Sequence, residues 1–235
     1  MKSPHNGLWH CALALIFVVP AMAQNEEPSR IPTWQDEIAK GFVPHHQLTV
    51  DDFRIDDKTH PEGSYWVKPF IHPYWHYILR ANDGWYYAYV DQWIIFSGFD
   101  KNDSTRKSKF REMQKSLPHA QAYLDLNEIY GRQLAALKPG ELPSGRGATQ
   151  REAATALKQS LQAFLKEKYR PLDAEEQEFQ KATNHGTNTK KVLELAHAIR
   201  KRLDTIPAPT AAPCDSLTAP PSQSPAPQPS ATPNK

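Results

Sequence analysis

His119 begins a run of residues whose types and spacing match those of a catalytic zinc helix. Such helices carry histidines at positions i and i+4, which hold the metal, and a glutamate after the first histidine, which takes a proton from the metal-bound water. Here Ala120 stands at the glutamate position and Tyr123 at the second histidine position. A methyl group accepts no proton, and a phenol with a reference pKa of about 10 is a poor substitute for imidazole at zinc. The pattern therefore predicts a site that has lost its base and one of its metal ligands.

Two further segments accompany this run, in an order and at a spacing that carry a resemblance. His119–Tyr130 (HAQAYLDLNEIY) is similar to H-E-Q-[GA]-H-F-D-[IL]-x-E-[LI]-Y, Leu48–Phe53 (LTVDDF) to L-T-W-x-D-F, and Phe179–Gly186 (FQKATNHG) to Y-D-x-x-T-x-H-G. Over roughly residues 45–205 the chain thus resembles a bacterial family of predicted secreted zinc-dependent proteases, an uncharacterised domain family numbered nine-two-two. The departures at Ala120 and Tyr123 make this chain a degenerate member.

His185 is the second candidate ligand that the resemblance implies. In the family the corresponding histidine is expected to complete the metal site from a separate helix. The alternative is a cation at a helix C-terminus, with Gly186 as the left-handed residue that ends the helix. His119 and His185 would be the whole inherited set of ligands, and a catalytic zinc normally has three protein ligands. We therefore expect no cofactor, or only weakly bound zinc.

The other polar candidates favour structural roles. His119 itself has a second interpretation, as a partly buried, hydrogen-bonded histidine at a helix N-terminus. His72 and His76 lie four residues apart on a predicted strand, which places them about 13 Å apart and prevents them from sharing one ion. We expect the remaining histidines to lie on the surface and the two acids of the helix to be on exposed faces: His45, His46, His60, His197, Asp125 and Glu128.

The first residues of the chain predict export. Residues 1–23 have the features of a signal peptide, with Lys2, an apolar stretch too short to span a bilayer and a small-x-small cleavage site after Ala23. A polar lead-in (24–40) follows, and the tail (206–235) is rich in Pro, Ala and Ser, a composition typical of disorder. The mature chain would keep one cysteine, Cys214, so no internal disulfide is expected.

Composition narrows the possible functions and partners further. Lys and Arg total 28 against 26 Asp and Glu, and no basic stripe with interleaved aromatic residues appears, which argues against nucleic acid as a partner. No segment after the signal is apolar enough to span a membrane. Residues 41–205 are long enough for one domain with a sizeable core.

The elements that must position these residues are a hairpin followed by helices. Aromatic-rich strands flank Asn82-Asp83-Gly84, which suits a tight turn and predicts an antiparallel sheet. After it we expect a helix that ends or kinks at Pro118, another to about Leu137, a loop at 143–147, a long helix over 149–183 broken at Pro171, and a last helix capped by Thr187 or Asn188. The fold class is α+β, a sheet packed against about four helices, and the resemblance implies a zincin-like helix arrangement.

These observations lead us to expect a secreted or periplasmic, non-catalytic domain that binds peptides or an envelope protein. Two alternatives stay open. One is an active metal-dependent peptidase with a rearranged site that includes His119, His185 and an unidentified third ligand. The other is an envelope structural module that works through its Pro-rich tail.

Overall fold

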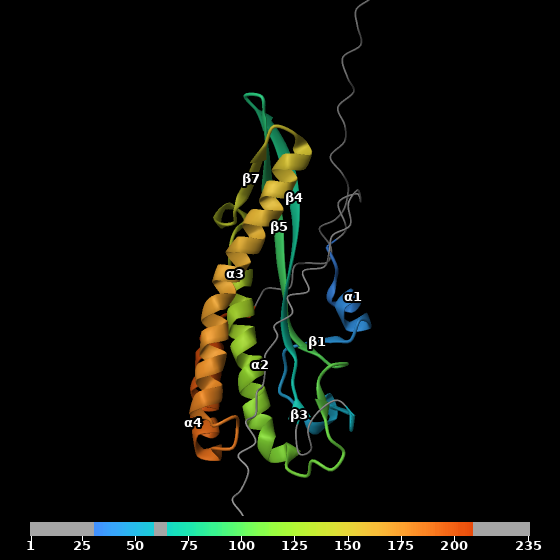
Figure 1. Cartoon of the computed structure of the whole chain (residues 1–235), viewed down its shortest axis with the longest axis vertical. Helices are drawn as coiled ribbons and strands as arrows, with labels where there is room; N and C mark the ends of the chain where they lie inside the picture. Colours follow the sequence, from blue (N-terminus) through green and yellow to red (C-terminus); the bar gives the residue numbers. More distant parts are fainter. Residues whose placement is uncertain (1–30, 59–64, 209–235) are drawn as a thin grey trace, which may run out of the picture.

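A computed structural model describes residues 31–58 and 65–208, which form an elongated molecule built along one hairpin (Figure 1). The elements are α1 (Trp34–Ala39), β1 (Phe42–Pro44), β2 (Arg54–Ile55), β3 (Tyr65–Trp66), β4 (Pro69–Asn82), β5 (Trp85–Asp100), β6 (Thr105–Arg106), α2 (Met113–Ala135), β7 (Ser144–Gly147), α3 (Gln150–Ala182) and α4 (Thr189–Asp204), with short 3-10 turns at Val50–Asp52 and Pro139–Glu141. The predicted signal peptide, His60 and Cys214 lie outside the described residues.

The hairpin of β4 and β5 is the backbone of the fold. Its two-residue turn, Asp83-Gly84, has positive φ at both positions (49° and 76°), as the tight turn of a right-twisted hairpin requires. The strands pair from Asn82↔Trp85 down to Pro69↔Phe99, with a bulge between His76 and Tyr77. The predicted hairpin is confirmed, and its strands run further than the aromatic segments alone indicated.

Strand β5 lies at the centre of the larger sheet. Beside β4 on one flank, β5 pairs on its other flank with β1 near one end and with β7 near the hairpin turn. Residues 143–147, which we expected to be a loop, therefore supply strand β7. Among the described strands, none pairs with the outer side of β4, which is an edge over its whole length. A second sheet, in the order β2-β6-β3, is small.

The long helices begin at side-chain caps. Thr149 and Glu152 form a reciprocal capping box at the start of α3, and Asn188 accepts a hydrogen bond from Lys191 N–H at the start of α4. No helix ends at Pro118 and the predicted break at Pro171 is wrong, since both prolines lie inside continuous helices. Buried neighbours pack along both helices through these positions, and this packing outweighs the loss of one backbone hydrogen bond at each proline.

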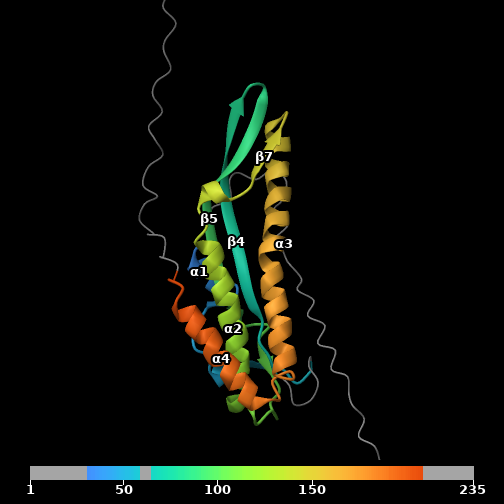
Figure 2. The same cartoon turned by 90° about the vertical axis from the view of Figure 1, so that its left-hand side faces the viewer.

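Three hydrophobic clusters follow one another along the molecule. One lies around Phe99 and Leu124, a second around Leu126 and Phe179, and a third around Ala88 and Leu157 near the hairpin turn. Helices α2 and α3 cover one face of the hairpin, and α4 lies outside α2 (Figure 2). This arrangement confirms the α+β class, with an antiparallel sheet packed against four helices in the described residues.

Helix α1 lies within the segment that we expected to be a polar lead-in. It packs on the opposite face of the sheet from α2, where the Trp34 ring meets Phe96 edge-on at 4.7 Å and the fully buried Glu37 accepts a hydrogen bond from the Tyr74 hydroxyl. The ordered domain thus begins before residue 41. None of the helices in the described ranges is long and apolar enough to cross a membrane.

Candidate functional site

His119 lies in the interior of the molecule, between α2 and the end of α3. Its ring stacks on Phe179 with centroids 5.2 Å apart, and its Nδ1 lies 2.6 Å from the Tyr65 hydroxyl. Burial, and secondarily the charge of His185, lowers the pKa of His119 to about 4, so the imidazole is neutral at physiological pH. Its Nε2 is buried and has no hydrogen-bond partner among the described residues.

The Tyr65 contact engages Nδ1 of His119 and leaves Nε2 facing the interior. Burial raises the pKa of Tyr65, so this hydroxyl keeps its proton. A protonated hydroxyl can donate to Nδ1 or accept from it, so the contact fits either tautomer of the neutral imidazole. The structural interpretation of His119 as a buried, hydrogen-bonded histidine accounts for the contact at Nδ1.

The two substituted positions of the helix have different surroundings. Ala120 is fully buried in the cluster that contains Phe99 and Leu124, whereas Tyr123 belongs to the neighbouring cluster. The Tyr123 ring meets His119 edge-on at 5.3 Å and Phe179 edge-on at 5.3 Å. Both positions are filled by core side chains, and a carboxylate at position 120 would be surrounded by hydrocarbon.

The structure brings the segment around His185 against His119. Three consecutive residues, Asn184, His185 and Gly186, have positive φ (48°, 52° and 83°) and turn the chain back after α3. A Cβ at Gly186 would lie 3.1 Å from the His119 ring, so the approach requires glycine. His185 itself is exposed, with Nδ1 3.1 Å from the Gln180 side-chain oxygen.

The donor set does not fit a catalytic zinc site. His119 is buried with Nδ1 engaged by Tyr65, and His185 is exposed with Nδ1 engaged by Gln180. Within residues 31–58 and 65–208, no three His, Cys, Asp or Glu side chains form a group suited to a metal ion. We therefore derive no chemistry through zinc at this position.

A second polar cluster, around Asp125, was missed by sequence reasoning. Asp125 is 2% exposed, and it is bound by His45 Nε2 (2.8 Å), the Gln121 amide (2.7 Å) and Arg200 Nε (3.1 Å). Gln121 also accepts a hydrogen bond from the backbone N–H of Leu48. The expectation that Asp125 lies on an exposed face and His45 on the surface is wrong, because three segments distant in sequence converge on this carboxylate.

Glu128 is likewise buried rather than exposed. It accepts hydrogen bonds from Ser97 Oγ at 2.6 Å and from Arg132 Nε at 2.8 Å. Its ion pair with Arg132, four residues on, lies at the interface between α2 and β5. Asp125 and Glu128 therefore connect α2 to its neighbours on different sides.

Glu176 forms a third buried polar pair, on the side of α3 that faces α2. The Asn127 amide donates a hydrogen bond to Glu176 at 2.7 Å and another to the Tyr123 carbonyl at 3.0 Å. Burial, assisted by the negative charge of Asp173, raises the pKa of Glu176 to about 7. No sequence pattern marks this residue, which stands among several acids of a helix.

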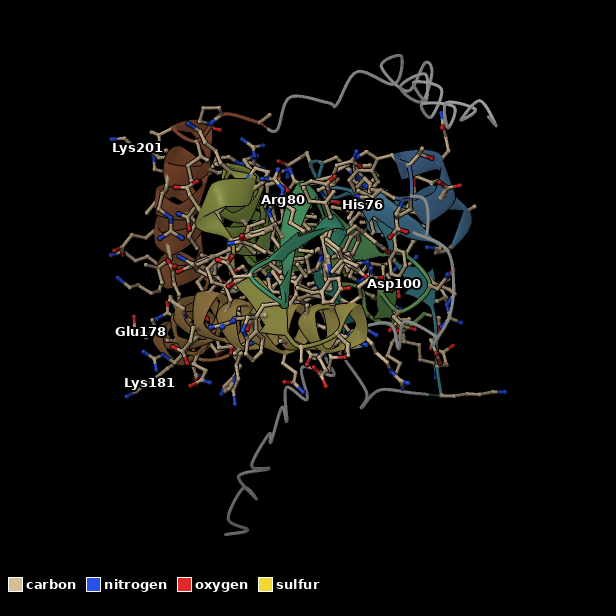
Figure 3. All side chains as sticks on the ribbon, turned by 90° about the horizontal axis from the view of Figure 1, so that it is seen from above. His76, Arg80, Asp100, Glu178, Lys181 and Lys201 are labelled. Atoms are coloured by element: carbon tan, nitrogen blue, oxygen red, sulfur yellow. The ribbon has the colours of Figure 1, made fainter. Side chains whose placement is uncertain are left out.

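The part of the hairpin near its turn presents aromatic side chains to solvent. Alternation places Trp85, Tyr87 and Tyr89 on one face of β5, where the rings of Tyr87 and Tyr89 stack at 6.3 Å and Arg146 from β7 lies 4.0 Å above Trp85. Arg80 pairs with Tyr87 across the hairpin. Figure 3 shows Arg80 and His76 on the side of the sheet away from α3, whose outer face carries Glu178 and Lys181.

The edge strand β4 carries further exposed apolar groups on its other face. Tyr77 and Leu79 are 39% and 37% exposed, although their partners across the hairpin, Val90 and Ala88, are buried beneath α3. Helix α3 thus covers β5 and β7 but leaves β4 uncovered near the turn. This stretch combines unpaired backbone groups with apolar side chains on both faces.

Searches among protein-family models, curated proteins and solved structures found no match to this chain.

Proposed function

We propose that this chain is an exported, non-catalytic relative of metal-dependent peptidases that binds an extended segment of another polypeptide along strand β4. The observation that carries the proposal is the outer edge of β4, a strand of fourteen residues that no other described strand pairs with on that side, with Tyr77 and Leu79 exposed beside it. A strand edge offers a row of backbone donors and acceptors, and the partner that satisfies them best is another extended backbone.

The lineage part of the proposal rests on the meeting of two segments. The helix that carries His119 and the turn that carries His185 lie more than fifty residues apart in sequence, yet Gly186 lies directly against the His119 ring. This contact is what an inherited metal site would leave behind. It also gives some support to the alternative of an active peptidase with a rearranged site.

The loss of catalysis is supported by the packing of the two substituted positions. Ala120 is 0% exposed and Tyr123 is 7% exposed, so both belong to the closed core and neither offers a base or a second imidazole beside His119. A base would have to be supplied by another residue. Glu176, the buried carboxylate with the raised pKa, accepts a hydrogen bond from the Asn127 amide instead.

Metal binding separates the non-catalytic proposal from the active peptidase. Purified residues 24–235, equilibrated with zinc and then desalted, are expected to retain much less than one ion per chain and to cleave no unstructured protein substrate. Tyr123→His places a second imidazole at i+4 and is expected to raise zinc affinity. Near-stoichiometric zinc in the unaltered chain, with cleavage lost in His119→Ala, would establish the active peptidase instead.

Strand addition at β4 is tested with peptides selected from a library of extended decapeptides. Leu79→Lys adds a charge beside the edge and is expected to weaken binding by roughly tenfold, the cost of losing about 1.4 kcal/mol of contact. Leu193→Lys is the matched control, since Leu193 is an exposed leucine on α4 and is 53% exposed. Equal affinity in both variants, or a failure to select any peptide, would refute binding at this edge.

A further inference from the structure

A groove of about 510 Å³ lies between the C-terminal part of α2 and the middle of α3, away from His119 and from the β4 edge. Its apolar lining comes from Leu134, Leu137 and Pro171, and its polar rim includes Tyr130, Gln133, Glu167 and Lys168. Leu134 is buried at 4% exposure, whereas Glu167 and Lys168 are open to solvent and give the rim one charge of each sign. The groove therefore suits a short segment with one apolar side chain and an acidic group placed on the Lys168 side.

The wall of the groove also has an unusual backbone acceptor. Pro171 lies inside α3 and has no N–H, so Glu167, a residue of the groove lining, has a carbonyl without its usual helical donor four residues on. An extended segment in the groove brings backbone N–H groups that can satisfy such a carbonyl.

The chain leaves the last helix beside this groove. The Tyr130 hydroxyl donates to Glu175, which is held by two hydrogen bonds from Arg202 near the end of α4 (2.6 and 2.9 Å). One turn later the carbonyl of Ile206 accepts a hydrogen bond from Arg132 at 2.7 Å. The C-terminus of the described chain is thus attached to the same part of α2 that lines the groove.

The sequence after residue 208 contains a segment of the required chemistry. Twenty-seven residues follow (235 − 208), and Leu217 is the one Leu, Ile, Val, Met or aromatic residue among them. Asp215, two positions earlier, is the one acidic residue. Leu217 is nine residues beyond 208, a reach of up to about 28 Å at 3.1 Å per residue, whereas Tyr130 to Leu137 covers only about 10 Å of helix.

We propose that the chain's own tail returns to this groove, with Leu217 seated against Leu134 and Leu137 and Asp215 beside Lys168. Because the tail is tethered at the mouth of the groove, its effective concentration there is of the order of millimolar, so a weak contact is enough to occupy the site. The groove is then an intramolecular docking site for residues 214–217.

Cys214 allows a direct test, because it is the sole cysteine of residues 24–235. A nitroxide label on Cys214 is expected to broaden the NMR amide signals of Leu134, Leu137 and Lys168, while Asn82 at the far hairpin turn stays sharp. Reduction of the label restores the signals. Absence of selective broadening at the groove would overturn the proposal.

The variant Leu217→Ser tests the anchor without touching the folded domain. Loss of the leucine side chain is expected to lower occupancy of the groove by roughly tenfold and to sharpen the same amide signals, whereas Thr218→Ser leaves them broadened. The source of the broadening is identified in a mixture of two chains. One carries the nitroxide and no ¹⁵N, and the other carries ¹⁵N and no nitroxide. Broadening in that mixture would show docking by a second copy and would contradict an intramolecular site.

Discussion

At the scale of single residues, buried carboxylates that the sequence pattern placed on the surface connect segments that lie far apart in the sequence. Asp125 joins the segment after β1, helix α2 and helix α4 through His45, Gln121 and Arg200. A buried charge is tolerated when several donors surround it, and removing one member leaves the others without a partner. The same residue type on an open helix face would contribute little.

Asp125→Ala is expected to lower the free energy of unfolding by about 3 kcal/mol, because the donors of His45, Gln121 and Arg200 lose their shared acceptor. Denaturant unfolding at neutral pH measures the loss. Glu194→Ala, which removes an exposed pair with Lys191, is the control and is expected to change stability by less than about 0.5 kcal/mol. Similar losses in the two variants would show that the Asp125 cluster stabilises nothing.

Glu176 makes stability depend on pH in a direction opposite to that of a salt-bridged acid. Its pKa in the folded protein is about 7 against 4.5 for the ordinary side chain, so between these values the folded state holds the proton more often than the unfolded state. Stability from this group therefore falls as pH rises from about 4.5 to 7, by up to about 3 kcal/mol at 1.36 kcal/mol per pKa unit.

Glu176→Gln is expected to remove this loss, since the amide keeps a hydrogen bond to Asn127 and carries no charge. The variant should gain stability relative to the unaltered chain as pH rises from 5 to 8, measured by denaturant unfolding at each pH. His119, with a pKa lowered to about 4, acts in the reverse sense in both proteins and cancels in the comparison. If the difference in free energy of unfolding between the two proteins does not change with pH, Glu176 does not titrate with a raised pKa in the folded state.

At the scale of elements, close backbone contacts decide how the short strand β7 joins the helices. Gly145 of β7 lies against α3 so closely that a Cβ would meet the Ala153 carbonyl oxygen at 2.1 Å and the Leu157 nitrogen at 2.3 Å. Both neighbours are backbone atoms of a helix and cannot move aside independently. The glycine is therefore what allows a four-residue strand to pair with β5 beneath α3.

Gly145→Ala is expected to destabilise the protein by roughly 1–3 kcal/mol, because the added methyl group separates β7 from α3. Gly140→Ala is a matched control in the preceding turn, where a Cβ would meet nothing within 4 Å. Thermal unfolding of the two variants provides the comparison. Equal melting temperatures would mean that β7 shifts to accommodate the methyl group at no cost.

At the scale of the whole molecule, the elongated shape divides the core into three successive clusters. Within the described residues, α3, 33 residues long, the hairpin and the link from α2 to β7 connect the region near the turn to the opposite end (Figure 2). Regions with separate hydrophobic contacts open with separate free energies. The end of the hairpin that carries the proposed binding edge can therefore open without unfolding the part around His119.

Leu157→Ala, in the cluster near the hairpin turn, is expected to cost about 2–5 kcal/mol locally and to speed hydrogen exchange in β7 and in β5 around Ala88. Leu124→Ala, in the cluster at the other end, is the matched substitution of a fully buried leucine. It should speed exchange in the first half of α2 instead. Uniform acceleration by both variants would indicate a single cooperative core.

The local part of this structure could be predicted from the sequence alone. The Asp83-Gly84 turn between aromatic strands, the cap at Asn188 and the change to helical periodicity are short-range features, and each depends on neighbours within a few residues. The predictions that helices break at Pro118 and Pro171 failed because they, too, considered only neighbours within a few residues. A proline's cost is local, whereas the packing that carries each helix past it is tertiary.

Only the tertiary structure decided which polar groups share an environment. His45 and Asp125 are eighty residues apart and Asn127 and Glu176 forty-nine, and no spacing rule links such pairs before the chain is folded. From the sequence alone, through a resemblance, we predicted that Ala120 and Tyr123 stand at the base and second-ligand positions of a zinc helix. The fold determined that those positions are closed core, because burial depends on what the rest of the chain packs against them.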